Sequence, residues 1–204
     1  PSRIVWSGSP GQEGVLLVGI EGSVPAAESA AERVVSALAD QGLWGQALAQ
    51  DDADRVWSDH EAQVTGAEGE TVLGVNGLPS ELAILAEVVH HGAGEARVAA
   101  RMASWAGQGM HTICFDEGEP AQHAEAVRQV RAYADRAGCS TMLHRRRDQV
   151  DRHLEVMGTP PSAVGVLRAI KAQFDPDHRL APGRFAGWYE QPPTRPASAG
   201  RGTA

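Results

Sequence analysis

Apolar positions along the chain change between two spacings, and each change marks a predicted element. Residues 15–20 form a short apolar run typical of a buried strand. A break at Gly22 follows, Pro25 then opens a helix, and Gly42 ends it. One face of this helix carries apolar residues at helical spacing: Ala27, Ala31, Val34, Val35 and Leu38. The chain is therefore predicted to begin with a strand and a helix.

The middle of the chain repeats this order and adds a hairpin. A more polar helix is predicted over residues 52–64 and a strand over residues 71–76. Ser80 can cap the next helix, which is expected to end near Gly92. Strict alternation from Arg97 to Ser104, a glycine-rich turn and a returning apolar run then predict a β-hairpin.

Two further helices follow the hairpin. Pro120 opens the first, which ends at Gly138 before a strand over residues 140–145. The second has an apolar face that ends at Phe174, and Asp175-Pro176 stops it. Strands and helices in this order, around a central hairpin, favour an α+β fold. We predict a ferredoxin-like antiparallel sheet covered by helices on one face.

Chain length and composition limit the possible domain organisation, partners and location of the protein. With 204 residues the chain is long enough for one sizeable core. We expect one domain over residues 15–189, after a lead-in over residues 1–14 and before a disordered tail over residues 190–204. The formal charge of −8 disfavours nucleic acid and anionic membrane as partners. No apolar run approaches the roughly 20 residues that cross a bilayer, so we expect no membrane insertion and a cytoplasmic protein.

Cysteine and histidine spacings indicate no metal site. Cys114 and Cys139 stand alone in different elements, which favours buried free thiols over a zinc site or a cysteine-ligated cluster. His90-His91 ends a helix, where adjacent residues do not share a face. His111 and His123 are the nearest alternatives, but neither belongs to a convincing chelating motif.

The most specific pattern lies after the last helix. Asp175-Pro176 is followed by three residues and then by Leu180, Ala181, Pro182-Gly183 and Arg184. This pattern resembles the C-terminal signature of FAD-linked oxidases of the vanillyl-alcohol-oxidase type, which ends in Leu-Asn-Pro-Gly and a basic residue. The rest of the chain is similar, more loosely, to FAD-binding subunits of glycolate oxidases. Ala181 stands where the family has Asn, so a hydrogen bond from that amide near the flavin is absent.

The resemblance implies the cap, or substrate, domain of an oxidoreductase that transfers hydride from a 2-hydroxy acid such as glycolate to FAD. It also implies partners: another flavoprotein subunit and an iron–sulfur subunit of an oxidase complex. The domain that binds the FAD pyrophosphate precedes this region in the family. The glycine-rich residues 8–14 do not replace it, because they open a strand rather than a helix. The chain starts at Pro1, so we expect a fragment or processed chain that is inactive in isolation.

Two groups of residues are candidates for a site. Pro182, Gly183 and Arg184 are expected to bind the cofactor, since the proline and glycine form a fixed corner that presents Arg184. A salt bridge that closes the turn is the alternative role of this arginine. Arg145 and Arg147 are expected to face one side of an extended segment and to bind a substrate carboxylate. A solvated strand end or a subunit contact is the alternative here.

A second function stays open. The chain could be a non-catalytic assembly subunit whose ferredoxin-like sheet binds another flavoprotein and whose own flavin site has decayed. The missing Asn at Ala181 and the missing phosphate-binding domain favour this alternative. A reading frame that extends upstream by about 150 to 200 residues, a typical domain length, and contains a glycine-rich loop would favour the enzyme.

Overall fold

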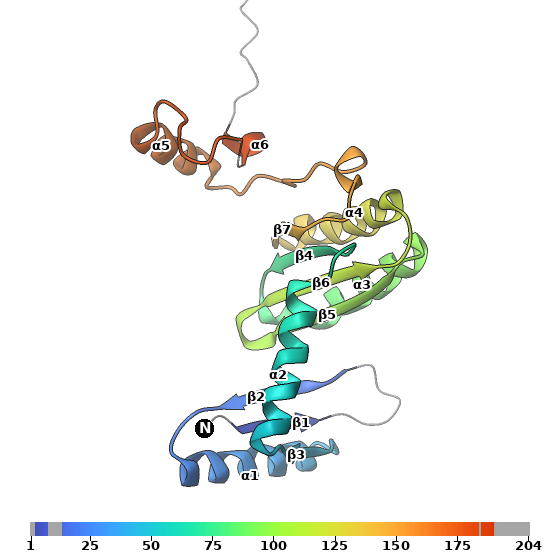
Figure 1. The fold of residues 1–204 in the computed structure, drawn as a ribbon, viewed down its shortest axis with the longest axis vertical. Helices are drawn as coiled ribbons and strands as arrows, with labels where there is room; N and C mark the ends of the chain where they lie inside the picture. The colour runs from blue at the N-terminus through green and yellow to red at the C-terminus, as the bar shows by residue number, and fades with distance from the viewer. Residues whose placement is uncertain (1–2, 8–13, 184, 190–204) are drawn as a thin grey trace, which may run out of the picture. The chain divides into compact units, whose positions relative to one another are not determined.

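A computed structural model of the chain describes residues 3–7, 14–183 and 185–189. The chain divides into two compact units, Pro1–Ala62 and Gln63–Ala204 (Figure 1). The sequence predicts one domain over residues 15–189, whereas this division falls within helix α2, Gln50–Thr65. Ala53 is the one buried residue of α2. We call the second unit the sheet unit.

The first unit contains a three-stranded antiparallel sheet. Its strands β1 (Arg3–Ser7), β2 (Leu16–Ile20) and β3 (Gly45–Ala47) lie in the order β2-β1-β3. Helix α1 (Val24–Asp40) connects β2 to β3 and buries Ala27 on its predicted apolar face. The sequence predicts β2 and α1. It predicts a lead-in over residues 1–14, where β1 forms, and no strand at β3.

The sheet unit is a mixed α/β structure with a four-stranded antiparallel sheet, as the sequence predicts at that level. The strands lie in the order β5-β6-β4-β7. In chain order the elements are β4 (Thr71–Asn76), α3 (Leu82–Ala96), β5 (Ala99–Trp105), β6 (Met110–Asp116), α4 (Pro120–Ala137) and β7 (Ser140–Arg145). A short 3-10 helix, η1 (Pro79–Glu81), precedes α3.

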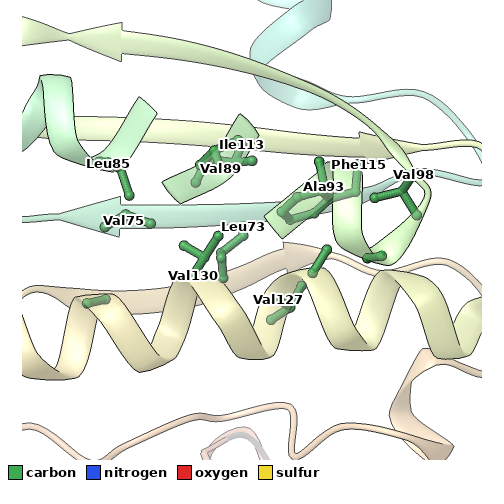
Figure 2. Close-up of a cluster of buried hydrophobic side chains, with 13 residues drawn as sticks. Leu73, Val75, Leu85, Val89, Ala93, Val98, Ile113, Phe115, Val127 and Val130 are labelled. Carbon is green, nitrogen blue, oxygen red and sulfur yellow. The ribbon is translucent and has the colours of Figure 1, made fainter. Parts of the chain in front are cut away.

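The core lies on the sheet face that α3 and α4 cover. Alternation along the central strands sends Leu73 and Val75 of β4, and Ile113 and Phe115 of β6, to this face. All four are fully buried. In Figure 2 they meet apolar side chains of the two helices: Leu85, Val89, Ala93, Val127 and Val130. Each large side chain contributes about 1.5–3 kcal/mol when buried, so the sheet unit has a core of its own.

Helix α3 continues past Gly92, where the sequence predicts its end. A Cβ at this position would lie 3.3 Å from the Cβ of Gln129 in α4, so the glycine allows the two helices to approach closely. Burial of Ala93 and Ala96 in the core outweighs the roughly 1 kcal/mol that a glycine costs within a helix. The helix is instead capped by Arg97, which has a φ of 59°.

The predicted hairpin is confirmed. β5 and β6 pair with Met102 opposite Ile113, and the 3-10 turn η2 (Ala106–Gln108) connects them. Gly109 completes the connection with a φ of 64°. A Cβ there would lie 2.0 Å from the carbonyl oxygen of Gly77, so only glycine fits.

Beyond β7 the chain forms the 3-10 turn η3 (Val150–Arg152) and helices α5 (Val164–Phe174) and α6 (Ala186–Tyr189). The helix predicted before Asp175 is confirmed as α5. None of its residues is buried. The tail predicted over residues 190–204 lies outside the described residues.

Candidate functional site

The sheet face opposite α3 and α4 carries polar side chains around Glu70, which is 4% exposed just before β4. Its carboxylate accepts two hydrogen bonds from the guanidinium of Arg101 in β5, at 2.5 and 2.7 Å. It also accepts one from the backbone N of Ala67 at 2.6 Å. The hydrogen bonds from Arg101 hold the pKa of Glu70 below its usual value, although burial opposes this shift. Glu70 is thus a buried carboxylate whose charge is balanced.

Arg145 brings a second cation to this group. It is the last residue of β7, is exposed, and lies opposite Val72 of β4. Its charge also lowers the pKa of Glu70, after the larger effect of Arg101. It forms no ion pair within the described ranges of the chain. Asp116 also acts on Arg101 through its charge, so the group holds two carboxylates and two guanidinium groups, of which that of Arg145 is exposed to an anionic ligand.

A bulge in β7 determines which side chains share this face. The pairing of β7 with β4 shifts by one residue at His144, so that Arg145 lies opposite Val72. The imidazole of His144 lies over Gly74, where a Cβ would come within 2.3 Å of Nε2. His144 and Arg145 therefore lie on the same face. Simple alternation, as the sequence predicts, would separate them.

Arg147 has different surroundings. Its backbone N donates a hydrogen bond to Oγ1 of Thr71 at 3.1 Å, and Thr71 is fully buried. Burial and the charge of Arg147 both lower the pKa of His123 in α4. The charge of Arg145 thus acts on Glu70 and that of Arg147 on His123.

Asp175 closes the C-terminal turn, which comprises residues 175–183. Its Oδ1 accepts a hydrogen bond from the backbone N of Arg179 at 2.7 Å, and its Oδ2 accepts one from that of Leu180 at 3.0 Å. Lys171 of α5 also donates to Oδ2, and to the carbonyl oxygen of Leu180 at 2.8 Å. The hydrogen bond from Lys171 is the main cause of the lowered pKa of Asp175. The aspartate of the oxidase-like signature thus has a structural role in this chain.

The second half of the turn has left-handed backbone conformations. Ala181 has a φ of 47° and Gly183 a φ of 80°. Pro182 and Gly183 are exposed. Arg184, the predicted cation of this corner, lies outside the described residues.

Helix α6 connects the turn to the chain that follows η3. Arg168 of α5 donates from Nε to the carbonyl oxygen of Trp188 at 2.6 Å, and Nε1 of Trp188 donates to that of Gly158 at 3.2 Å. The rings of Phe185 and Trp188 stack with centroids 5.7 Å apart. These contacts hold α5 and α6 as a small substructure, which we call the α5–α6 segment.

The two predicted groups of site residues have different contacts in the structure. Within the described ranges, no hydrogen bond or ion pair joins Arg145 or Arg147 to Pro182 or Gly183. Sequence reasoning missed the pair Glu70 and Arg101. One feature could have indicated it: Arg101 is the one charged residue of β5, in an otherwise uncharged hairpin strand.

The described residues also contain other clusters and hollows besides this group of charged side chains. No group of three or more His, Cys, Asp and Glu side chains in the described ranges is arranged to hold a metal ion. His91 lies 3.1 Å from Glu95 in an exposed pair. In the first unit, an open hollow of about 470 Å³ is lined by six residues of α1 and β3: Glu28, Ala31, Glu32, Val35, Ser36 and Ala47. No described helix is both long and apolar enough to span a bilayer.

No protein-family model matches the chain, and no curated protein is similar to it.

Proposed function

We propose that the chain is the C-terminal cap, or substrate, domain of an FAD-dependent oxidoreductase that acts on a 2-hydroxy acid such as glycolate. The C-terminal turn carries this proposal. Asp175 closes the turn, and residue 181 has a φ of 47°, a conformation that Asn adopts more readily than most non-glycine residues. The position where the oxidase signature has Asn thus has a backbone that suits Asn, although the residue here is Ala181.

The topology of the sheet unit supports the same proposal. Its elements follow one another as strand, helix, strand, strand, helix, strand, and its strands lie in the order β5-β6-β4-β7. This is the arrangement of ferredoxin-like folds, which the resemblance implies for the cap domain. Many unrelated functions share this fold, so the topology supports the architecture and adds little about the reaction.

The substrate carboxylate is proposed to bind at Arg145. This residue adds a guanidinium beside the pair Glu70 and Arg101, and a planar guanidinium matches the two oxygens of a carboxylate. Arg147 is the second candidate. FAD would supply the hydride acceptor, while the groups of this chain orient the substrate. The proposed contacts with FAD are those of the turn: Pro182, Gly183 and Arg184.

An assembly subunit without catalysis of its own is the second candidate. Helix α5 carries three apolar side chains spaced four residues apart, Val166, Ile170 and Phe174, which are 63%, 50% and 78% exposed. An apolar stripe on an exposed helix suits docking into a groove of another protein. The proposed partners are the other flavoprotein and the iron–sulfur subunit of an oxidase complex.

NMR titration of the 15N-labelled chain with FAD and with glycolate, added separately, tests the proposal. We expect FAD to shift the amide signals of Leu180, Ala181 and Gly183, and glycolate to shift those around Arg145. The substitution Arg145→Met should abolish the glycolate shifts. Arg136→Met, at an exposed arginine near the end of α4, is the matched control and should preserve them.

Two results would contradict the oxidoreductase proposal. The first is the absence of shifts when either ligand is added to about 10 mM. A contact with a binding free energy of about 4 kcal/mol has a Kd of about 1 mM and would be nearly saturated at that concentration. The second is equal shifts from glycolate and acetate, because acetate lacks the hydroxyl group. Binding of a flavoprotein subunit through α5, without ligand shifts, would favour the assembly function. Flavin absorbance retained through gel filtration would instead support a cofactor site within this chain.

A further inference from the structure

The buried imidazole of His123 joins three segments that are distant in the sequence. His123 lies in α4 and is fully buried. Its Nδ1 lies 2.9 Å from Oγ1 of Thr71, at the start of β4, and its Nε2 is hydrogen-bonded to the carbonyl oxygen of Glu117, between β6 and α4. The same Thr71 oxygen accepts a hydrogen bond from the backbone N of Arg147, just after β7.

The partners determine where the protons lie. A carbonyl oxygen only accepts, so Nε2 of His123 carries a proton and donates it to Glu117. The backbone N of Arg147 only donates, so the Thr71 oxygen accepts there. The hydroxyl hydrogen of Thr71 is then donated to the unprotonated Nδ1. Neutral His123 in this tautomer satisfies every group of the network.

We propose that His123 is an acid-sensitive lock on the chain after β7, and that protonation of its Nδ1 releases the backbone at Arg147. A protonated Nδ1 is a donor and no longer accepts the Thr71 hydrogen. The Thr71 oxygen then faces two donors, and its own hydrogen loses its acceptor in a buried position. The Thr71 oxygen has two lone pairs and can still accept from both donors, but its buried hydrogen without a partner costs about 1–3 kcal/mol. Opening of the backbone at Arg147 lets water accept this hydrogen and removes the cost, so protonation favours the open state.

The charges around His123 are consistent with this role. Burial is the main cause of its lowered pKa, and Arg147 after β7 acts in the same direction. The carbonyl of Glu117, Asp116 at the end of β6 and Glu70 before β4 act in the opposite direction but do not outweigh burial. His123 is therefore neutral at neutral pH, and the lock opens only below the ordinary histidine pKa of about 6.5.

Release of Arg147 would free the end of the strand that carries Arg145 two residues earlier. Acid would thus change the basic segment of the candidate site without any change in the charge of its arginines. The inference concerns the backbone of this chain, and it holds whether or not the segment binds a hydroxy acid.

Amide hydrogen exchange at Arg147 tests the lock, with rates divided by those of an unfolded chain at the same pH. Protection at about pH 7.5 should fall at least tenfold by about pH 5, as expected when a group with a shifted pKa takes up a proton. In 15N NMR spectra at neutral pH, the ring of His123 should show the Nε2-protonated tautomer. Unchanged protection down to about pH 5, or an Nδ1-protonated ring at neutral pH, would overturn the proposal.

Matched substitutions test whether the Thr71 hydroxyl and the His123 imidazole are each needed for the pH-dependent protection of Arg147. Thr71→Val keeps the shape but removes the hydroxyl, and should abolish protection of Arg147 at either pH. Thr71→Ser keeps the hydroxyl and should behave like the unchanged chain. His123→Gln can donate to Glu117 but cannot titrate, so protection should no longer depend on pH. If that variant does not fold, the comparison of Thr71→Val with Thr71→Ser still tests the proposal.

A second buried histidine supplies the control for specificity. His111 is 3% exposed, and burial lowers its pKa as well. His111→Gln should leave the pH dependence at Arg147 in place. Loss of the dependence in this variant would assign the effect to His111 and overturn the role of His123.

Discussion

Within the sheet unit, the four-stranded sheet with α3 and α4 and the α5–α6 segment are stabilised by different forces. Between the sheet and its two helices, Leu73 and Phe115 are fully buried with their apolar neighbours. No residue of α5 is buried, and Phe174 is 78% exposed. Burial of apolar surface contributes about 25 cal/mol per Å², so it dominates in the first region and contributes little in the second.

Hydrogen bonds to backbone carbonyls, rather than an apolar core, hold the chain between η3 and α6. Arg131 of α4 is 8% exposed and donates to the carbonyl oxygens of Glu155 and Val156, at 2.5 and 2.7 Å. Further on, Trp188 donates to Gly158. Such bonds contribute about 0.5–3 kcal/mol each. The sheet and its helices can therefore specify their own structure, whereas the α5–α6 segment depends on a few polar contacts.

The largest effect should come from a cavity in the core. Phe115→Ala removes a fully buried ring between the sheet and the helices, and the free energy of unfolding should fall by about 3–5 kcal/mol. Phe174→Ala truncates the same side chain where it is exposed, and the change should stay within about 0.5 kcal/mol. Urea unfolding followed by circular dichroism measures both. Similar losses in the two variants would contradict the contrast between the regions.

A smaller effect is expected where the two regions meet. Arg131→Met removes the donors to Glu155 and Val156, and should destabilise the chain by about 1.5–3 kcal/mol, the range for bonds to a charged group. Residues 153–159 should also become more sensitive to proteolysis. Arg128→Met is the control one turn earlier: Arg128 also donates to a carbonyl, that of His153, but its side chain is 47% exposed. Its loss should cost less than about 1 kcal/mol.

The sequence predicts the elements with strong periodicity and misses those without it. Helix α4 follows its apolar spacing and ends at Gly138 as expected, with a φ of 70° at the glycine. Strand β3, Gly-Gln-Ala, has no apolar alternation to reveal it. At Gly92 the same residue type could end a helix or allow close packing, and only the position of α4 decides between them.

The candidate site was less predictable because its contacts are not local. Glu70 and Arg101 are 31 residues apart in the sequence, and only the strand order brings them together. The bulge at His144 cannot be inferred from the sequence pattern, because it interrupts the alternation that would place His144 and Arg145 on opposite faces. The role of His123 depends on Thr71, 52 residues away. The sequence pattern indicates Arg145 and Asp175 as candidate site residues. The residues that contact them can be identified only from the fold.

Acid should weaken the four-stranded sheet and its helices α3 and α4 before the C-terminal turn. Burial lowers the pKa of both His111 and His123, so the unfolded chain binds more protons than the folded chain below about pH 6.5. The free energy of unfolding should therefore fall as pH decreases from that value through the folded pKa values, by at most about 1.4 kcal/mol per pH unit for each histidine. Urea titrations between about pH 7.5 and 5 measure this slope.

The turn supplies the internal comparison for that experiment. Asp175 has a lowered pKa, so it stays ionised until the pH falls below the usual aspartate value of about 3.9. Hydrogen-exchange protection of the Leu180 amide, which donates to Asp175, should thus remain constant while the four-stranded sheet and its helices lose stability. A flat stability curve, or parallel loss of protection at Leu180, would contradict the assignment of the effect to the buried histidines.

The smallest expected effect is a gain in stability at Ala181. Its φ of 47° is unfavourable for a residue with a Cβ, by roughly 1 kcal/mol, and glycine removes this cost. Ala181→Gly should raise protection of the Leu180 amide two- to fivefold, and Ala181→Asn should have a smaller effect in the same direction. Ala172→Gly, on an exposed position of α5, is the control and should lower protection, because glycine disfavours a helix by about 1 kcal/mol. If both glycine variants lowered protection, the left-handed conformation of Ala181 would not carry this strain, and the link between the turn and the oxidase signature would lose its main support.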